Sequence, residues 1–178
     1  VCGAVSADSD VPLAVLIGLK NLLIGGFTRE RFVEWLSLPI VSEKFDLESD
    51  DLAILNRWLA AAGFEVGLNP AHLDAQRDAQ AADPRQTQVY APAALHELTL
   101  ERALERLAFG WMLPQDEDAA PYGDVLPVVG TELGGWDATG EKSGLLLKLA
   151  NLYAVLETLR LKTAEGEKLT DGTSAHFW

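Results

Sequence analysis

"LSLPIVSEKFDLESDDLAILNRWLAAAGFEVGLN", residues 36–69, carries the clearest helical pattern in the chain. Apolar residues recur there at three- and four-residue spacing, as expected for one face of a helix: Leu52, Leu55, Trp58, Leu59 and Ala62. Ser49 is the predicted N-cap of this helix, and Gly63 marks its predicted end. Pro39 ends a preceding helix, and the residues that follow it predict one further short turn.

The same spacing recurs over most of the sequence and predicts an all-α fold. Further helices are predicted at about residues 10–26, 28–38, 69–82, 99–111 and 143–162. The segments 83–98 and 113–142 lack periodicity and are predicted to be irregular. We therefore expect one helical domain over residues 1–178, with two candidate sub-clusters, 11–82 and 99–162, separated by a loop at 83–98.

The helical spacing also predicts which side chains form the core. The expected buried residues are Phe32, Leu36, Leu52, Leu55, Trp58, Leu104, Leu107, Leu149, Leu152 and Leu156. An apolar stripe is predicted for the first helix from Leu13, Leu16, Ile17, Leu19, Leu22 and Leu23. Three tryptophans, Trp35, Trp58 and Trp111, lie on such stripes and are predicted to be buried.

Composition restricts the function classes. The 178 residues carry a formal net charge of −13, which argues against a stand-alone nucleic-acid binder. The apolar runs are too short to cross a bilayer, and the single cysteine, Cys2, excludes an internal disulfide. We expect an intracellular, cytoplasmic protein without membrane contact. The chain begins at Val1 rather than methionine, which favours a domain excised from a longer polypeptide.

One stretch approaches a nucleotide-binding loop. In "GGWDATGEKSG", residues 134–144, Gly135 and Gly140 have the spacing of a phosphate loop, but Glu141 separates the second glycine from Lys142. That insertion moves the lysine out of register and adds a carboxylate where phosphate would bind. We expect no ATP binding, and interpret Ser143 as the N-cap of the next helix.

Other chemical motifs are equally incomplete. The acidic run from Asp46 to Asp51 lacks the glycine and glutamate that a calcium loop requires, so an acidic helix start is the preferred interpretation. His72, His96 and His176 are far apart in sequence and are expected at the surface or at the edge of the core. The sequence therefore predicts no catalytic residue, no cofactor and no metal site.

Two features are candidates for binding instead. Arg102 and Arg106 lie four residues apart on one predicted helix face and are the candidate DNA contacts; ion pairs with Glu101 and Glu105, or exposure to solvent, are the alternative. Trp136 lies in an irregular segment without an apolar stripe, which makes it a candidate partner contact.

Residues 36–69 resemble the gamma chain of exodeoxyribonuclease V, the RecC subunit of the RecBCD helicase–nuclease. That family has a Leu-x-x-Pro-x-Val-like turn, then Phe-Asp-Leu/Ile, an acidic helix start and a Leu-x-x-Trp helix that ends in glycine. The matching positions are Pro39, Phe45, Asp46, Leu47, Leu52, Leu55, Trp58, Gly63, Gly67, Leu68 and Asn69. "ALERLAFGWML" and "APYGDV" look like later family motifs, so the resemblance covers roughly Val11 to Lys162. It departs at Leu100 and Glu101, where the family has Trp-Arg, and over residues 70–98.

The resemblance implies a non-catalytic helical domain similar to the 2B-type insertion of a superfamily 1 helicase-like protein. It implies the beta and alpha chains of exodeoxyribonuclease V as partners, with DNA held by the complete complex during bacterial double-strand break repair and homologous recombination. The parent complex would be the ATP-dependent enzyme, and this segment would have no active site. The alternative is a free-standing helical adaptor or regulator that binds a protein partner through its acidic surface.

Overall fold

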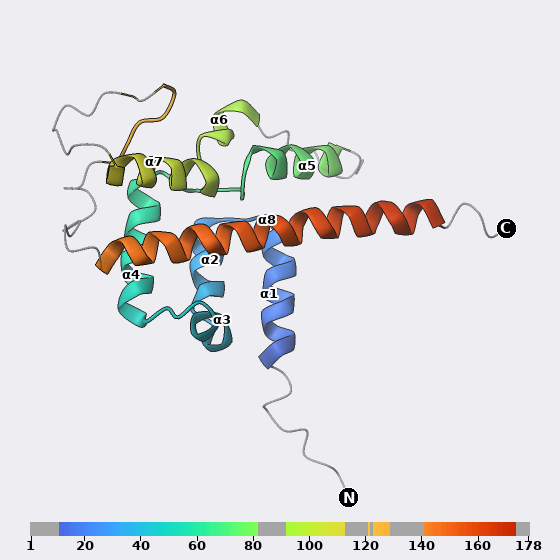
Figure 1. Ribbon diagram of the computed structural model, residues 1–178. Helices are drawn as coiled ribbons and strands as arrows, with labels where there is room; N and C mark the ends of the chain where they lie inside the picture. The colour runs from blue at the N-terminus through green and yellow to red at the C-terminus, as the bar shows by residue number, and fades with distance from the viewer. Residues whose placement is uncertain (1–10, 82–91, 113–120, 122, 129–140, 174–178) are drawn as a thin grey trace, which may run out of the picture.

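A computed structural model describes residues 11–81, 92–112, 121, 123–128 and 141–173, and its regular elements are helices (Figure 1). They are α1 (Val11–Gly25), α2 (Arg29–Leu36), α3 (Pro39–Lys44), α4 (Ser49–Ala61), α5 (Pro70–Ala81), α6 (Pro92–His96), α7 (Leu100–Met112) and α8 (Glu141–Thr173). Extended pairing among the described residues includes an isolated bridge between Thr28 and Val66 but no strand. The predicted all-α fold is confirmed.

Local sequence signals account for several helix boundaries. Thr28 is the N-cap of α2, and its Oγ1 accepts a hydrogen bond from the backbone N–H of Arg31 at 3.5 Å. Gly63 follows the end of α4 with a φ of 76°, a left-handed conformation that glycine adopts without steric cost. The predicted cap of α4 was wrong by one residue. Glu48 occupies that position, and its backbone N–H donates to Asp51 Oδ2 at 3.1 Å in a reciprocal capping box.

Two segments are more helical than the sequence pattern predicted. The expected loop at 83–98 contains α6 (Pro92–His96), which proline can begin because its fixed φ suits the first helical position. Helix α8 continues to Thr173, beyond the predicted end at Lys162. The apolar stripe stops near that point, and the extension mixes good helix formers with Gly166 and Gly172, so neither periodicity nor propensity in the sequence predicts its length.

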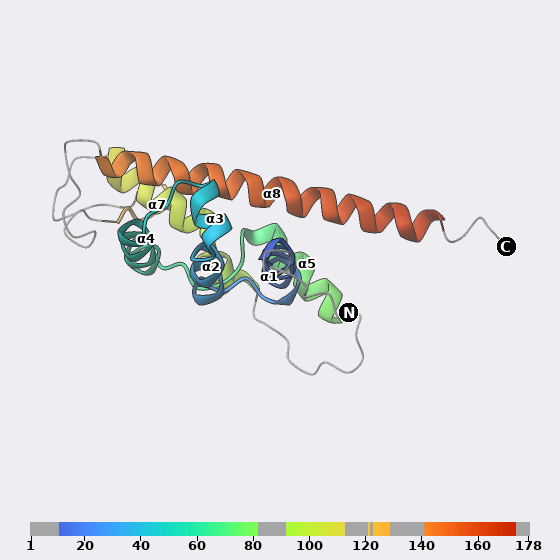
Figure 2. The same ribbon diagram turned by 90° about the horizontal axis from the view of Figure 1, so that it is seen from below.

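Helix α8 runs along the other helices and contributes buried leucine side chains to the core that they share. Its C-terminal part extends past α1 and α5 in both views (Figures 1 and 2). Of the ten residues predicted to be buried, Leu52 and Leu104 are only partly buried and the other eight are buried. A single hydrophobic core includes residues from both candidate sub-clusters.

The segment that follows α4 lies between the end of α1 and the start of α7. Phe27, Phe32 and Phe64 form an aromatic group with ring centroids 5.4–6.0 Å apart. The backbone N–H of Gly67 donates to the Phe27 carbonyl at 2.7 Å, while the Gly67 carbonyl accepts from Leu100 N–H at 3.0 Å. The connection therefore holds the start of α7 against the end of α1 through backbone hydrogen bonds.

Two predictions about burial were wrong. Trp111 is 49% exposed, because the inner face of α7 runs through Leu107 and Gly110 and turns Trp111 away by about 100°. Gly110 lies against the 123–128 segment, where a Cβ atom would be only 2.2 Å from the carbonyl oxygen of Val128. In α1, Leu13, Leu16 and Ile17 are exposed, whereas Leu22 is buried. The six residues assigned to one stripe in fact spread over about 220° of the helix circumference, from an inner side to an outer side.

The length and hydropathy of the described helices are not those of a membrane span. None of them is sufficiently long and apolar to cross a bilayer.

Candidate functional site

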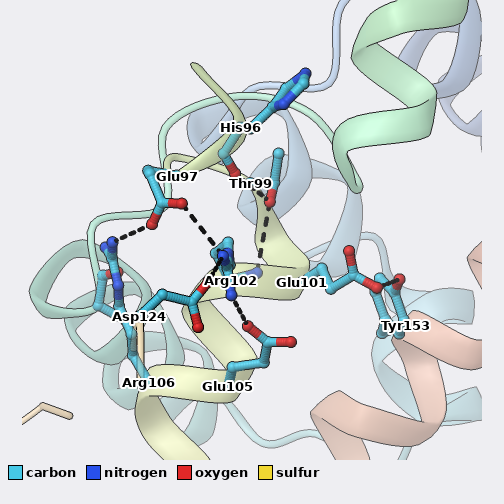
Figure 3. A network of polar contacts seen from close by, with 10 residues as sticks. His96, Glu97, Thr99, Glu101, Arg102, Glu105, Arg106, Asp124 and Tyr153 are labelled. Carbon is cyan, nitrogen blue, oxygen red and sulfur yellow. Dashed lines mark hydrogen bonds and ion pairs between the residues drawn. The ribbon is translucent and has the colours of Figure 1, made fainter. Parts of the chain in front are cut away.

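The two arginines singled out in the sequence lie in one network of ion pairs on α7, shown in Figure 3. We call Arg102, Arg106, Glu97, Glu105 and Asp124 the arginine cluster. Arg102 donates to Glu105 at 2.7 Å and to Asp124, and its guanidinium lies 3.3 Å from Glu97. Its carboxylate partners come from the segment before α7, from α7 itself and from the 123–128 segment, so the cluster joins three parts of the chain.

Arg106 has a different environment from Arg102. Its Nη1 donates to the carbonyl of Ala62 at 3.0 Å, and its Nη2 donates to Glu97 at 3.1 Å. Ala62 is the buried C-cap of α4, where a helix presents unpaired carbonyl groups and a partial negative charge. Arg106 therefore caps α4 from α7, with its side chain only 21% exposed.

The electrostatics of the cluster oppose the binding of a further anion. The hydrogen bonds that Arg102 donates to Glu105 and then to Asp124 raise the pKa of Arg102, and the bond that Asp124 accepts lowers the pKa of Asp124. Three carboxylates face two guanidinium groups, which leaves one net negative charge. The sequence left open ion pairs with Glu101 and Glu105 as an alternative to DNA contact, and one of them is present. Glu105 pairs with Arg102, while Glu101 accepts a hydrogen bond from Tyr153 instead.

Tyr153 connects α8 to α7 and to the start of α5. Its hydroxyl donates to Glu101 Oε1 at 2.9 Å and accepts from Asn69 Nδ2 at 3.3 Å. Burial, with a further contribution from the Glu101 carboxylate, raises the pKa of Tyr153 to about 12, so the hydroxyl keeps its proton and donates. These bonds fix the position of α8 along the core.

His72 is buried, which corrects the prediction of a surface or boundary histidine. Its Nδ1 accepts from the Leu68 N–H at 3.1 Å, and its Nε2 lies 2.8 Å from the Leu23 carbonyl. This arrangement requires the neutral ring with hydrogen on Nε2, and burial lowers the pKa of His72. The ring links α5 to the end of α1 as a structural group. His96 lies at the boundary as predicted, 3.3 Å from Asp74.

Several sequence candidates fall outside the described residues. They include Trp136, Cys2, His176 and both glycines of the incomplete phosphate loop. The acidic run after Asp46 forms the first turn of α4, where Asp50 and Asp51 lie near the helix N-terminus as expected. Lys148 of α8 donates to the carboxylate of Asp46 at 2.9 Å. No group of three potential metal ligands occurs within the part of the chain that the structure describes.

The chain matches one known protein family over most of its length. Residues 10–175 match the family described as RecBCD enzyme subunit RecC fourth domain. The chain belongs to this family. No significant match was found among curated proteins.

The match confirms the resemblance to RecC, and it extends beyond the motifs that carried that resemblance. In this RecC domain several matching residues serve packing: Trp58 and Leu68 are buried, and Gly63 lies beneath the guanidinium of Arg106. Sequence reasoning missed the Tyr153 contacts and the partners Glu97 and Asp124. Those partners lie outside the helix of Arg102, so no helical spacing could have indicated them.

Proposed function

We propose that this chain is a non-catalytic, architectural domain of the exodeoxyribonuclease V gamma chain. The observation that carries the proposal is the family match over residues 10–175. It is supported by the arginine cluster, where the strongest sequence candidates for DNA contact are occupied by carboxylates of the domain. The domain acts within a longer RecC polypeptide as a helical block similar to a 2B-type insertion.

In this proposal the beta and alpha chains are the partners, and the complete complex holds DNA in the bacterial cytoplasm during double-strand break repair and recombination. The domain supplies shape and contact surface. Its net charge of −13 opposes phosphate binding, which depends mainly on lysine and arginine replacing counterions. The basic surfaces that hold DNA belong chiefly to other domains.

Deletion from the full-length subunit tests the proposal. A RecC subunit in which a flexible linker replaces residues 10–175 is co-expressed with the other two subunits, and assembly, ATP hydrolysis and duplex unwinding are measured. We expect stable assembly or unwinding to be lost, and the separate 178-residue chain to hydrolyse neither ATP nor DNA. An altered complex that assembles and unwinds at the unmodified rate would contradict the architectural function.

A free-standing adaptor is the competing function, and an immunoblot separates the two. Antibodies against this domain should detect, in cells that express it naturally, a polypeptide much longer than 178 residues. A band at the size of this chain alone, without a longer species, would favour the adaptor.

A further inference from the structure

Helix α1 is apolar on two opposite faces. Its inner face carries the buried Leu22 together with Val15 and Leu19, which pack against the core. Trp35 Nε1 donates to the backbone carbonyl of Val15 at 3.3 Å and fixes this face against α2. The outer face carries four large aliphatic side chains that are 50–62% exposed: Leu13, Leu16, Ile17 and Ile24.

These four side chains form one stripe, which Lys20 interrupts between Ile17 and Ile24. At about 100° per residue, they fall within an arc of roughly 100° around the helix. The charged residue on this arc is Lys20, and the whole 15-residue helix contains no carboxylate, although the protein has a net charge of −13. A helix that is apolar all round is normally buried on all sides. α1 packs mainly on α2 and α3, which leaves the outer stripe uncovered within the described residues.

The size of the stripe limits what can cover it. Full burial of a leucine or isoleucine stabilises by about 1.5–3 kcal/mol, so covering the exposed halves of four such side chains provides about 3–6 kcal/mol. Association of separate molecules costs an estimated 4–15 kcal/mol in lost freedom of motion, so the stripe alone provides too little free energy to hold a second copy or a separate subunit stably. A covalently linked domain avoids most of that cost because its effective concentration is high.

A lipid surface fits the stripe poorly. Interfacial helices carry a strongly charged, usually basic polar face opposite the apolar one, whereas the opposite face of α1 forms part of the core. The negative charge of the chain would also repel anionic lipid headgroups.

We propose that the outer face of α1 is the docking surface for another domain of the same RecC polypeptide. This inference rests on the proposed function, because it requires the chain to be one domain of a longer subunit. The covering surface is apolar opposite Leu13, Ile17 and Ile24. It presents a carboxylate or backbone carbonyls to Lys20, since a buried ammonium group needs hydrogen-bond acceptors.

Thiol accessibility in the full-length subunit tests this docking. Single cysteines are introduced as Ile17→Cys or Leu16→Cys into a cysteine-free RecC subunit, with Ala53→Cys on the exposed face of α4 as the matched control. Maleimide labelling rates are measured for the subunit alone and for the assembled complex, and each rate is divided by the rate of the same variant in urea. We expect both α1 variants to react at least tenfold more slowly than the control, already in the subunit alone.

Each other outcome overturns the proposal in a recognisable way. Protection that appears only in the assembled complex would assign the stripe to a partner subunit, and protection lost on dilution of the subunit would assign it to a second copy. Protection that appears only when vesicles are added would assign it to a membrane. Rapid labelling under all conditions would leave the face in solvent. A normally assembled complex with an unprotected stripe would refute the docking alone, whereas failure of the proposed function would show in the deletion experiment.

Discussion

Replacement of Arg106 and of Arg102 should affect stability unequally, although the sequence presents the two residues alike. Arg106→Met keeps the aliphatic part of the side chain but removes the bond to the carbonyl of Ala62, which is buried at the end of α4. A buried carbonyl left without a partner costs about 1–3 kcal/mol, and the lost charge at the helix C-terminus adds about 0.3–1 kcal/mol. We expect a loss of about 2 kcal/mol.

Arg102→Met should cost less than about 1 kcal/mol. Its partners Glu97, Glu105 and Asp124 are 41–76% exposed, so water can solvate each carboxylate after the arginine is removed. Arg102 is protonated in the folded and unfolded states alike, so its raised pKa adds no pH-dependent stability near neutrality.

Urea unfolding and thermal unfolding of the 178-residue chain, each followed by far-ultraviolet circular dichroism, measure the loss of stability in both variants. The thermal midpoint should fall by about 4–8 °C for Arg106→Met, since 1 kcal/mol corresponds to about 2–4 °C at this size. Added salt should reduce the difference between Arg102→Met and the unmodified chain, because exposed ion pairs are screened. Equal losses for the two variants, or a larger loss for Arg102→Met, would refute the assignment of Arg106 as the cap of α4.

Three further predictions concern DNA binding, pH and backbone packing. The isolated chain should bind a labelled forked duplex with a Kd weaker than about 10 μM at physiological salt by fluorescence anisotropy. Sub-micromolar binding that Arg102→Ala/Arg106→Ala abolishes would make this domain a direct DNA contact. The lowered pKa of His72 means that the unfolded chain binds its proton first as pH falls, so stability should decline below about pH 6.5. The urea midpoint of His72→Gln should depend less on pH over this window, and an unchanged dependence would exclude the neutral ring. Gly110→Ala should destabilise by about 2 kcal/mol or more, because its Cβ would meet a backbone carbonyl. The control Gly144→Ala, with open space around it, should stabilise α8 by up to about 1 kcal/mol, and equal effects in a thermal melt would count against the close contact.

The sequence predicted a helix boundary correctly where that boundary depends on residues only a few positions away. Thr28 at the start of α2 and Gly63 after α4 act on backbone groups within a few positions, so their effects are visible in a local pattern. The end of α8 was missed because that helix continues after its apolar stripe has ended, through a stretch that includes Gly166 and Gly172.

The environment of the arginine cluster could not be predicted in this way. Asp124 meets Arg102 across 22 residues, and Ala62 meets Arg106 across 44, so each contact depends on how the helices pack. The error in α1 was avoidable. At 3.6 residues per turn the six residues cover about 220°, so a helical projection of the sequence would have shown that they cannot share one face.

Helix α8 is the last of the described helices along the chain, and this order has a consequence for synthesis on the ribosome. The inner leucines of α8, Leu145, Leu149, Leu152 and Leu156, pack on the core that residues 22–107 build. Translation at about 5–20 residues per second leaves roughly 2–9 seconds between emergence of α7 and of the last of these leucines. During that interval the apolar surface that α8 will cover faces solvent. The nascent domain should therefore be a substrate for chaperones that bind exposed apolar chain, until α8 arrives and closes the core.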